Sequence, residues 1–178
     1  MHASMDPREQ LDRLASYEAI RQLVYRYAVA VDARDTAAIA AMFVDDVQVA
    51  PGVTGRVALQ ASYDEMLGAQ EASILNVGNH VIDFDDADHA RGIVYCRAEI
   101  DAGDEWIVQQ IAYHDRYERH AGRWLFRGRR HLLFYGGDVL TRPNTLPAAE
   151  KPEYGTGRGT ASGSLAARTA EWHDPGTA

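Results

Sequence analysis

Residues 27–35 read Tyr-Ala-Val-Ala-Val-Asp-Ala-Arg-Asp, and they combine the clearest fold signal of the chain with its clearest site signal. The stretch ends a run of apolar residues at helical spacing, which predicts a long amphipathic helix. Asp32 falls at the margin of the buried face and at the helix C-terminus. Partial burial and the negative end of the helix dipole both raise the pKa of a carboxyl group, which suits a base. Asp32 is therefore a candidate general base, and the alternative is a structural cap or an ion pair with an arginine.

The sequence around this stretch predicts three helices. Asp6 followed by Pro7 is typical of a helix start, so the first helix begins there. Asp35 is expected to cap a short second helix that reaches Phe43. Apolar residues at helical spacing predict a third helix over residues 58–70.

Four long runs rich in β-branched and aromatic residues follow, and turn sequences rich in Asp and Gly separate them. The runs cover residues 74–84, 90–100, 107–119 and 124–135. This pattern predicts an antiparallel meander. Helices followed by a meander favour an α+β fold, here a cone-shaped barrel in which a strongly curved antiparallel sheet and the N-terminal helices enclose an internal pocket.

Length and composition predict one domain. The 178 residues, 46% of them hydrophobic, suit a single core. We expect residues 1–137 to form it. Residues 138–178 are rich in Gly, Pro and Ser, so we expect them to form an extended or disordered C-terminal tail.

Charge and cysteine content exclude several classes of protein. A net charge of -8 argues against nucleic-acid binding. Cys96 is the single cysteine, so an intrachain disulfide and a cysteine-rich zinc site are excluded. No pair of histidines has metal-ligand spacing, and we expect neither a metal nor a cofactor. The N-terminus lacks the pattern of a signal peptide and no apolar run is long enough to span a bilayer, so we expect a cytoplasmic protein without membrane contact.

Two segments carry a resemblance to a known family. Residues 11–46 resemble the opening of SnoaL-like proteins of the nuclear transport factor 2-like superfamily, and residues 115–126 resemble their final hairpin. The resemblance is closest to the dehydrochlorinase, scytalone dehydratase and bile-acid dehydratase branch. It implies the cone-shaped fold and an acid–base site in which an aspartate and a histidine exchange a proton.

The resemblance assigns several residues to that site. Asp32 matches the aspartate, Tyr27 matches a pocket tyrosine or lysine five residues before it, and Tyr113 matches a pocket tyrosine. Asn76 stands where the histidine is expected, and the nearest histidine is His80. An amide can orient a substrate but cannot accept a proton at neutral pH.

The position of His80 depends on the regularity of its strand. In a regular strand Asn76 and His80 share a face, whereas a bulge at Gly78 and Asn79 flips the face of His80. His80 is then either a pocket histidine that hydrogen-bonds Asp32 or a histidine satisfied by its own neighbours. His131, near the sheet end, is a further candidate pocket residue.

These residues predict a cofactor-free acid–base enzyme of the lyase, dehydratase or isomerase/cyclase type. Asp32, His80 and Tyr27 are its predicted catalytic residues, and Asn76, Tyr113 and His131 are its predicted substrate-binding residues. The predicted substrate is a small apolar or polycyclic metabolite such as a polyketide, terpenoid or steroid. The resemblance implies a homodimer or homotrimer. The alternatives are a non-catalytic ligand-binding or subunit-interaction module, and the small subunit of a ring-hydroxylating dioxygenase, which requires a partner chain.

Overall fold

The structure is a computed structural model that describes residues 6–141, 146–148 and 158–160. Every long helix and strand predicted from the sequence is confirmed, with ends that shift by a few residues. A short hairpin lies between the second and third helices. The elements are α1 (Pro7–Asp32), α2 (Thr36–Ala41), β1 (Gln48–Ala50), β2 (Val53–Thr54), α3 (Arg56–Gly68), β3 (Ala72–Phe84), β4 (His89–Asp101), β5 (Trp106–His120), β6 (Arg123–Asp138) and β7 (Gly159–Thr160).

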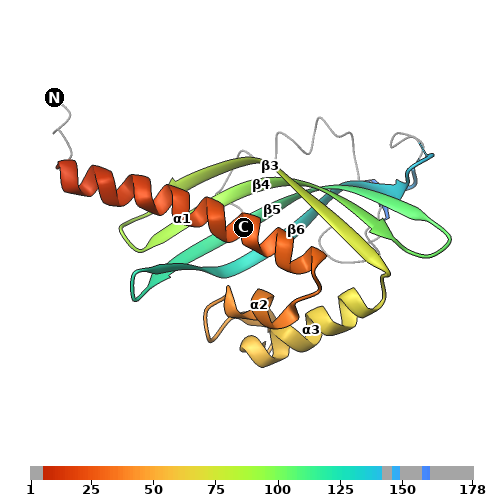
Figure 1. The fold of residues 1–178 in the computed structure, drawn as a ribbon, viewed down its shortest axis with the longest axis horizontal. Coiled ribbons are helices and arrows are strands. Elements are labelled where there is room, and N and C mark those ends of the chain that lie inside the picture. Colours follow the sequence, from red (N-terminus) through yellow and green to blue (C-terminus); the bar gives the residue numbers. More distant parts are fainter. Residues whose placement is uncertain (1–5, 142–145, 149–157, 161–178) are drawn as a thin grey trace.

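The fold is a helix-covered antiparallel sheet, so the predicted α+β class is confirmed. The strands follow the order β3-β4-β5-β6-β7, and all neighbours are antiparallel. Figure 1 shows α1 running beside β3, with α2 and α3 grouped at its C-terminal end. β3 and β7 are the two edges of the sheet. The described strands therefore form an open sheet, and the cone-shaped barrel remains a prediction.

Both predicted helix caps are present. The side chain of Asp6 accepts a hydrogen bond from the backbone N–H of Arg8, and Pro7 occupies the first helical position. Asp35 caps α2 by accepting from the N–H of Ala38 at 2.9 Å. The caps satisfy backbone donors that the first turn of a helix leaves free.

A bulge in β3 decides which residues face the core. The register between β3 and β4 shifts between Val77 and His80, at the site where the sequence allowed a bulge. Before the bulge, Ser73 and Leu75 point to the covered face, where they line a cavity. After it, His80 and Ile82 point to the covered face, because the extra residue reverses the alternation of side chains.

The predicted tail is described in part. Residues 142–145, 149–157 and 161–178 lie outside the described residues. β7 adds to the sheet edge, where Gly159 pairs with Gly136 and Thr160 pairs with Tyr135. Among the described residues, none of the helices has the length and apolar character that crossing a membrane requires.

Candidate active site

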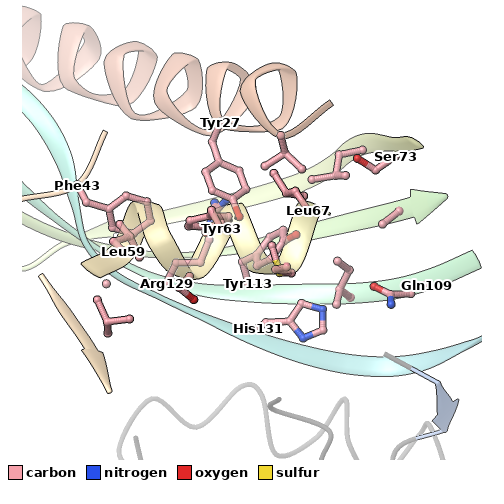
Figure 2. Close-up of a pocket in the computed structure, with 18 of the residues that line it drawn as sticks. Tyr27, Phe43, Leu59, Tyr63, Leu67, Ser73, Gln109, Tyr113, Arg129 and His131 are labelled. Carbon is pink, nitrogen blue, oxygen red and sulfur yellow. Dashed lines mark hydrogen bonds between the residues drawn. The ribbon is translucent and has the colours of Figure 1, made fainter. Parts of the chain in front are cut away.

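A cavity of about 370 Å³ lies between the sheet and helices α1 and α3. Its wall is mainly apolar, and Figure 2 shows the polar side chains that project into it. This volume lies near the lower end of the range for small-molecule sites. The polar and titratable residues of the wall include Tyr27, Tyr63, Ser73, Gln109, Tyr113, Arg129 and His131.

The guanidinium of Arg129 is the central charge of the cavity. Its side chain is 4% exposed and forms a bidentate ion pair with Asp115, from Nε to Oδ1 at 2.8 Å and from Nη2 to Oδ2 at 2.6 Å. The guanidinium carbon lies 4.2 Å from the ring centres of both Tyr27 and Tyr113, and 4.4 Å from that of Phe126. Nη1 is buried and has no hydrogen-bond partner among the described residues. Because Arg129 lines the cavity, its guanidinium places a fixed positive charge in the cavity wall.

The groups around Arg129 act as hydrogen-bond donors at neutral pH. Burial lowers the pKa of Arg129, but the charge of Asp115 and its hydrogen bonds outweigh that effect and hold the pKa well above its usual range. Burial raises the pKa of Tyr27, and raises that of Tyr63 and Tyr113 well above the usual value. The tyrosines are thus protonated donors at neutral pH. The hydroxyls of Tyr27 and Tyr63 are 2.8 Å apart and share a hydrogen bond.

His131 is a histidine that lines the cavity. Its ring centre lies 5.8 Å from that of Tyr113, with the planes inclined by 63°. Burial, and then the nearby charge of Arg129, lower the pKa of His131 to about 4. The imidazole is therefore neutral at pH 7 and can accept a proton. Ketosteroid isomerase uses a carboxylate of similar pKa as its general base.

His80 contacts the other side of the Arg129 ion pair. Tyr117 donates its hydroxyl proton to Asp115 Oδ2 at 2.7 Å, and His80 Nε2 lies 3.1 Å from the Tyr117 oxygen. Because Tyr117 has one proton, His80 must donate from Nε2. Burial lowers the pKa of His80 to about 4, in spite of the Asp115 charge. His80, Tyr117 and Asp115 thus form a chain of hydrogen bonds that ends at Arg129.

Asp32 lies outside this network. Its carboxylate is exposed and accepts a hydrogen bond from the backbone N–H of Leu75, at 3.0 Å to Oδ1 and 3.3 Å to Oδ2. Partial desolvation raises the pKa of Asp32, and the Leu75 N–H opposes that rise. Neither ring nitrogen of His80 bonds to Asp32, since Nε2 binds Tyr117 and Nδ1 has no partner among the described residues. The hydrogen-bonded Asp32–His80 pair considered in the sequence is not formed.

The structure brings together Tyr27, Tyr113 and His131 of the predicted site residues. Asn76 is exposed on the other face of β3 and does not line the cavity, because it alternates with Ser73 and Leu75, which do. Asn76 is therefore not among the predicted residues that the structure brings together at the cavity. Among the residues described, no group of three or more His, Cys, Asp and Glu side chains is placed to hold a metal ion.

Sequence reasoning missed Arg129 and Asp115. Asp115 shares the inward parity of Tyr113 and Tyr117 on β5, and that parity is a signal that was available. Arg129 had a weaker signal, because it belongs to a group of surface-like arginines in the last long strand. The bidentate pairing across β5 and β6 follows from the register that sets Asp115 opposite Arg129.

The sequence profile of the SnoaL-like domain matches residues 12–130, which extends from within α1 to the middle of β6. The chain belongs to the SnoaL-like family. No curated protein sequence matches this SnoaL-like protein at a significant level.

Solved structures give the same fold. A hexachlorocyclohexane dehydrochlorinase, LinA type 2, is 26% identical with a TM-score of 0.65, and the match covers 75% of this chain and 95% of that one. LinA type 3 from Novosphingobium barchaimii is 24% identical with a TM-score of 0.66, over 75% and 96% of the two chains. A provisionally assigned scytalone dehydratase from Novosphingobium aromaticivorans is 23% identical with a TM-score of 0.65, over 75% and 93%.

Proposed function

We propose that this SnoaL-like protein is a cofactor-free acid–base enzyme of the lyase type, which eliminates a small leaving group from a compact apolar molecule. The observation that carries the proposal is the buried guanidinium of Arg129, which belongs to the cavity wall and lies against the rings of Tyr27 and Tyr113. The likeness to a dehydrochlorinase supports the reaction class. The cavity volume favours a compact polyketide-like or terpenoid-like substrate over a large steroid.

The cavity residues divide the reaction between a base and an anion site. His131 removes a proton from carbon, the electrons of that bond form the new double bond, and the leaving group departs with the electrons of its own bond. Arg129 and the hydroxyls of Tyr27 and Tyr113 bind the developing negative charge. Preorganised donors of this kind contribute strongly to catalysis, because they need no reorganisation during the reaction.

Asp32 and His80 then have supporting roles. Asp32 holds Leu75, which lines the cavity, through the backbone N–H. His80 acts through Tyr117 and Asp115 on the orientation of Arg129. Both are positioning residues in this proposal, and Asp32 is the rival candidate for the base.

Turnover of two elimination substrates tests the proposal. Hexachlorocyclohexane reports through chloride release, and 4-hydroxy-4-phenylbutan-2-one reports through the absorbance of the enone formed on loss of water. We expect the natural protein to convert at least one of them. Arg129→Met should lower kcat about 100-fold or more, as loss of an oxyanion donor does. His131→Gln should lower kcat by at least about 100-fold.

The matched variant is Asp32→Asn, which should keep kcat within about threefold, because Asn still accepts from Leu75. Loss of turnover in Asp32→Asn, with turnover kept in His131→Gln, would assign the base to Asp32 instead. Failure of the natural protein to convert either substrate would favour the non-catalytic ligand-binding alternative. Light scattering tests the predicted homodimer or homotrimer independently.

A further inference from the structure

The cavity has a second polar group of residues, away from Arg129. Ser73 on β3 and Gln109 on β5 both line the cavity, and they are 7% and 9% exposed. The hydroxyl of Ser73 is buried without a hydrogen-bond partner among the described residues. The Gln109 side chain lines the same cavity. Figure 2 shows these two side chains at one end of the cavity, apart from Tyr27 and Arg129.

The sheet register explains why both side chains reach the same space. Ser73 pairs with Ile100 on β4, and Gln109 pairs with Ala98 on the same strand. Ala98 and Ile100 are two residues apart and therefore share a face, which places Ser73 and Gln109 on that face as well. Apolar side chains, including Leu75 and Ile111, line the wall near them. The cavity is thus mainly apolar and has two separate groups of polar residues.

Buried polar side chains without a partner are uncommon, because each loses its hydrogen bonds to water. In the Arg129 group the polar side chains largely satisfy one another, as Tyr27 does with Tyr63 and Arg129 with Asp115. The Ser73 hydroxyl has no such internal partner. A ligand in the cavity can supply one.

We infer that Ser73 and Gln109 are specificity residues that hydrogen-bond a neutral polar group of the substrate, at the end opposite to the group bound by Arg129. The inference rests on the proposed function for the identity of the reacting end. The substrate class is then a compact apolar molecule with a hydroxyl or carbonyl group at each end.

The chemistry of the two side chains favours a neutral group over a charged one. A serine hydroxyl and a glutamine amide each offer both a donor and an acceptor. Neither carries a charge, and Arg129 is the one lysine or arginine among the described residues of the wall. A carboxylate or ammonium at the Ser73 end would lie buried without a counter-ion, which is costly.

Binding of two matched fluorescent probes tests the inference. 2-Naphthol has one hydroxyl, whereas 2,6-dihydroxynaphthalene adds a second hydroxyl at the opposite end of the same ring system. Fluorescence titration of the full chain should give a Kd for the diol about tenfold lower than for 2-naphthol. A site built for a hydroxyl discriminates against the analogue that lacks it, because its own buried groups are then unpaired.

The double variant Ser73→Ala, Gln109→Leu should reduce that tenfold preference to less than about twofold. Ser62→Ala is the matched serine control, since Ser62 also lines the cavity but is exposed to water. Gln110→Leu repeats the glutamine change at the next residue of β5, which alternates to the other face. Both controls should keep the preference. Gln109→Ala serves as a second variant if the leucine change unfolds the protein.

Equal binding of the two probes by the natural protein would overturn the inference, and so would a preference that survives the double variant. These outcomes are independent of turnover. If the elimination assays fail while the probe preference is present and depends on Ser73 and Gln109, the proposed reaction falls and the specificity site stands.

Discussion

Asp32 and Asp115 are two aspartates with opposite surroundings. Asp32 ends α1, is exposed, and binds one backbone N–H. Asp115 is in the middle of β5, its side chain is fully buried, and it binds Arg129 and Tyr117. The sequence motif points to Asp32, but the burial and charge of the site are concentrated at Asp115. The position of a carboxylate in a sequence motif therefore does not determine its electrostatic environment.

The largest expected effect is a loss of stability when the buried Asp115 loses its charge. Asp115→Asn leaves the Arg129 charge buried without its partner, so it should lower the free energy of unfolding by about 3 to 5 kcal/mol. Urea unfolding followed by circular dichroism measures the loss. The exposed Asp45, which pairs with Arg56, supplies the control, and Asp45→Asn should cost less than about 1 kcal/mol.

A double variant tests whether the loss of stability comes from the unpaired charge of Arg129. Asp115→Asn combined with Arg129→Met removes both charges and should recover part of the stability, because no unpaired charge remains buried. A loss below about 1 kcal/mol for Asp115→Asn alone would contradict the assignment of a buried ion pair.

The next effect on stability concerns the packing around Gly92, which pairs with Asp115 in the sheet. A Cβ added to Gly92 would lie 2.9 Å from the Val81 carbonyl oxygen, 3.0 Å from a Tyr117 ring carbon and 3.1 Å from His80 Nε2. Gly92→Ala should therefore lower the free energy of unfolding by about 1 to 3 kcal/mol. Gly68→Ala, where the added carbon meets nothing within 4 Å, should have little effect. Equal stability of both variants would mean that the Tyr117 and His80 side chains can move freely.

The pH dependence of stability tests whether His80 and His131 are neutral in the folded protein. The pKa of His80 and that of His131 are each about 4 in the folded protein, whereas an unfolded histidine has a pKa of about 6.5. Between these values the unfolded chain binds more protons. The stability contributed by the neutral rings is therefore complete above about pH 6.5 and falls as the pH decreases toward about 4.

Urea unfolding at pH 7.5 and pH 5 measures this dependence. Partial exposure of the rings reduces the effect, and we expect a loss of about 1 to 2 kcal/mol at pH 5. His131→Gln should reduce the difference between the two pH values. The matched change His89→Gln should not reduce it, because Asp86 raises the pKa of this exposed histidine and the pair therefore stabilises the folded chain at the lower pH. An unchanged difference in His131→Gln would contradict the lowered pKa of His131.

The smallest effect is expected at Asp32. Asp32→Asn keeps an oxygen that accepts from Leu75, so the free energy of unfolding should change by less than about 0.5 kcal/mol. Asp32→Ala removes the acceptor and should cost about 1 kcal/mol. The same urea assay compares the two variants with Asp115→Asn. A loss of 3 kcal/mol or more in Asp32→Asn would remove the contrast between the two aspartates.

Local sequence signals predicted the elements of this fold well. The caps at Asp6 and Asp35 and the apolar spacing along α1 depend on neighbouring residues, so the sequence contains their cause. The parity of Tyr113 and Tyr117 likewise placed both on the inward face of β5. These interactions are short in range, and a sequence pattern captures them.

The order of helices and strands, the α+β class and the inward position of Tyr27 and Tyr113 can be read from the amino-acid pattern alone. Which polar groups meet depends on how the strands pair. The bulge after Val77 turns His80 inward, and the pairing of β5 with β6 sets Asp115 beside Arg129. The tertiary structure also leaves Asp32 exposed at the end of α1, bonded to the N–H of Leu75. The physical reason is that a side chain's period along a strand is local, whereas its partners depend on the register between strands, where one extra residue exchanges the two faces of the sheet.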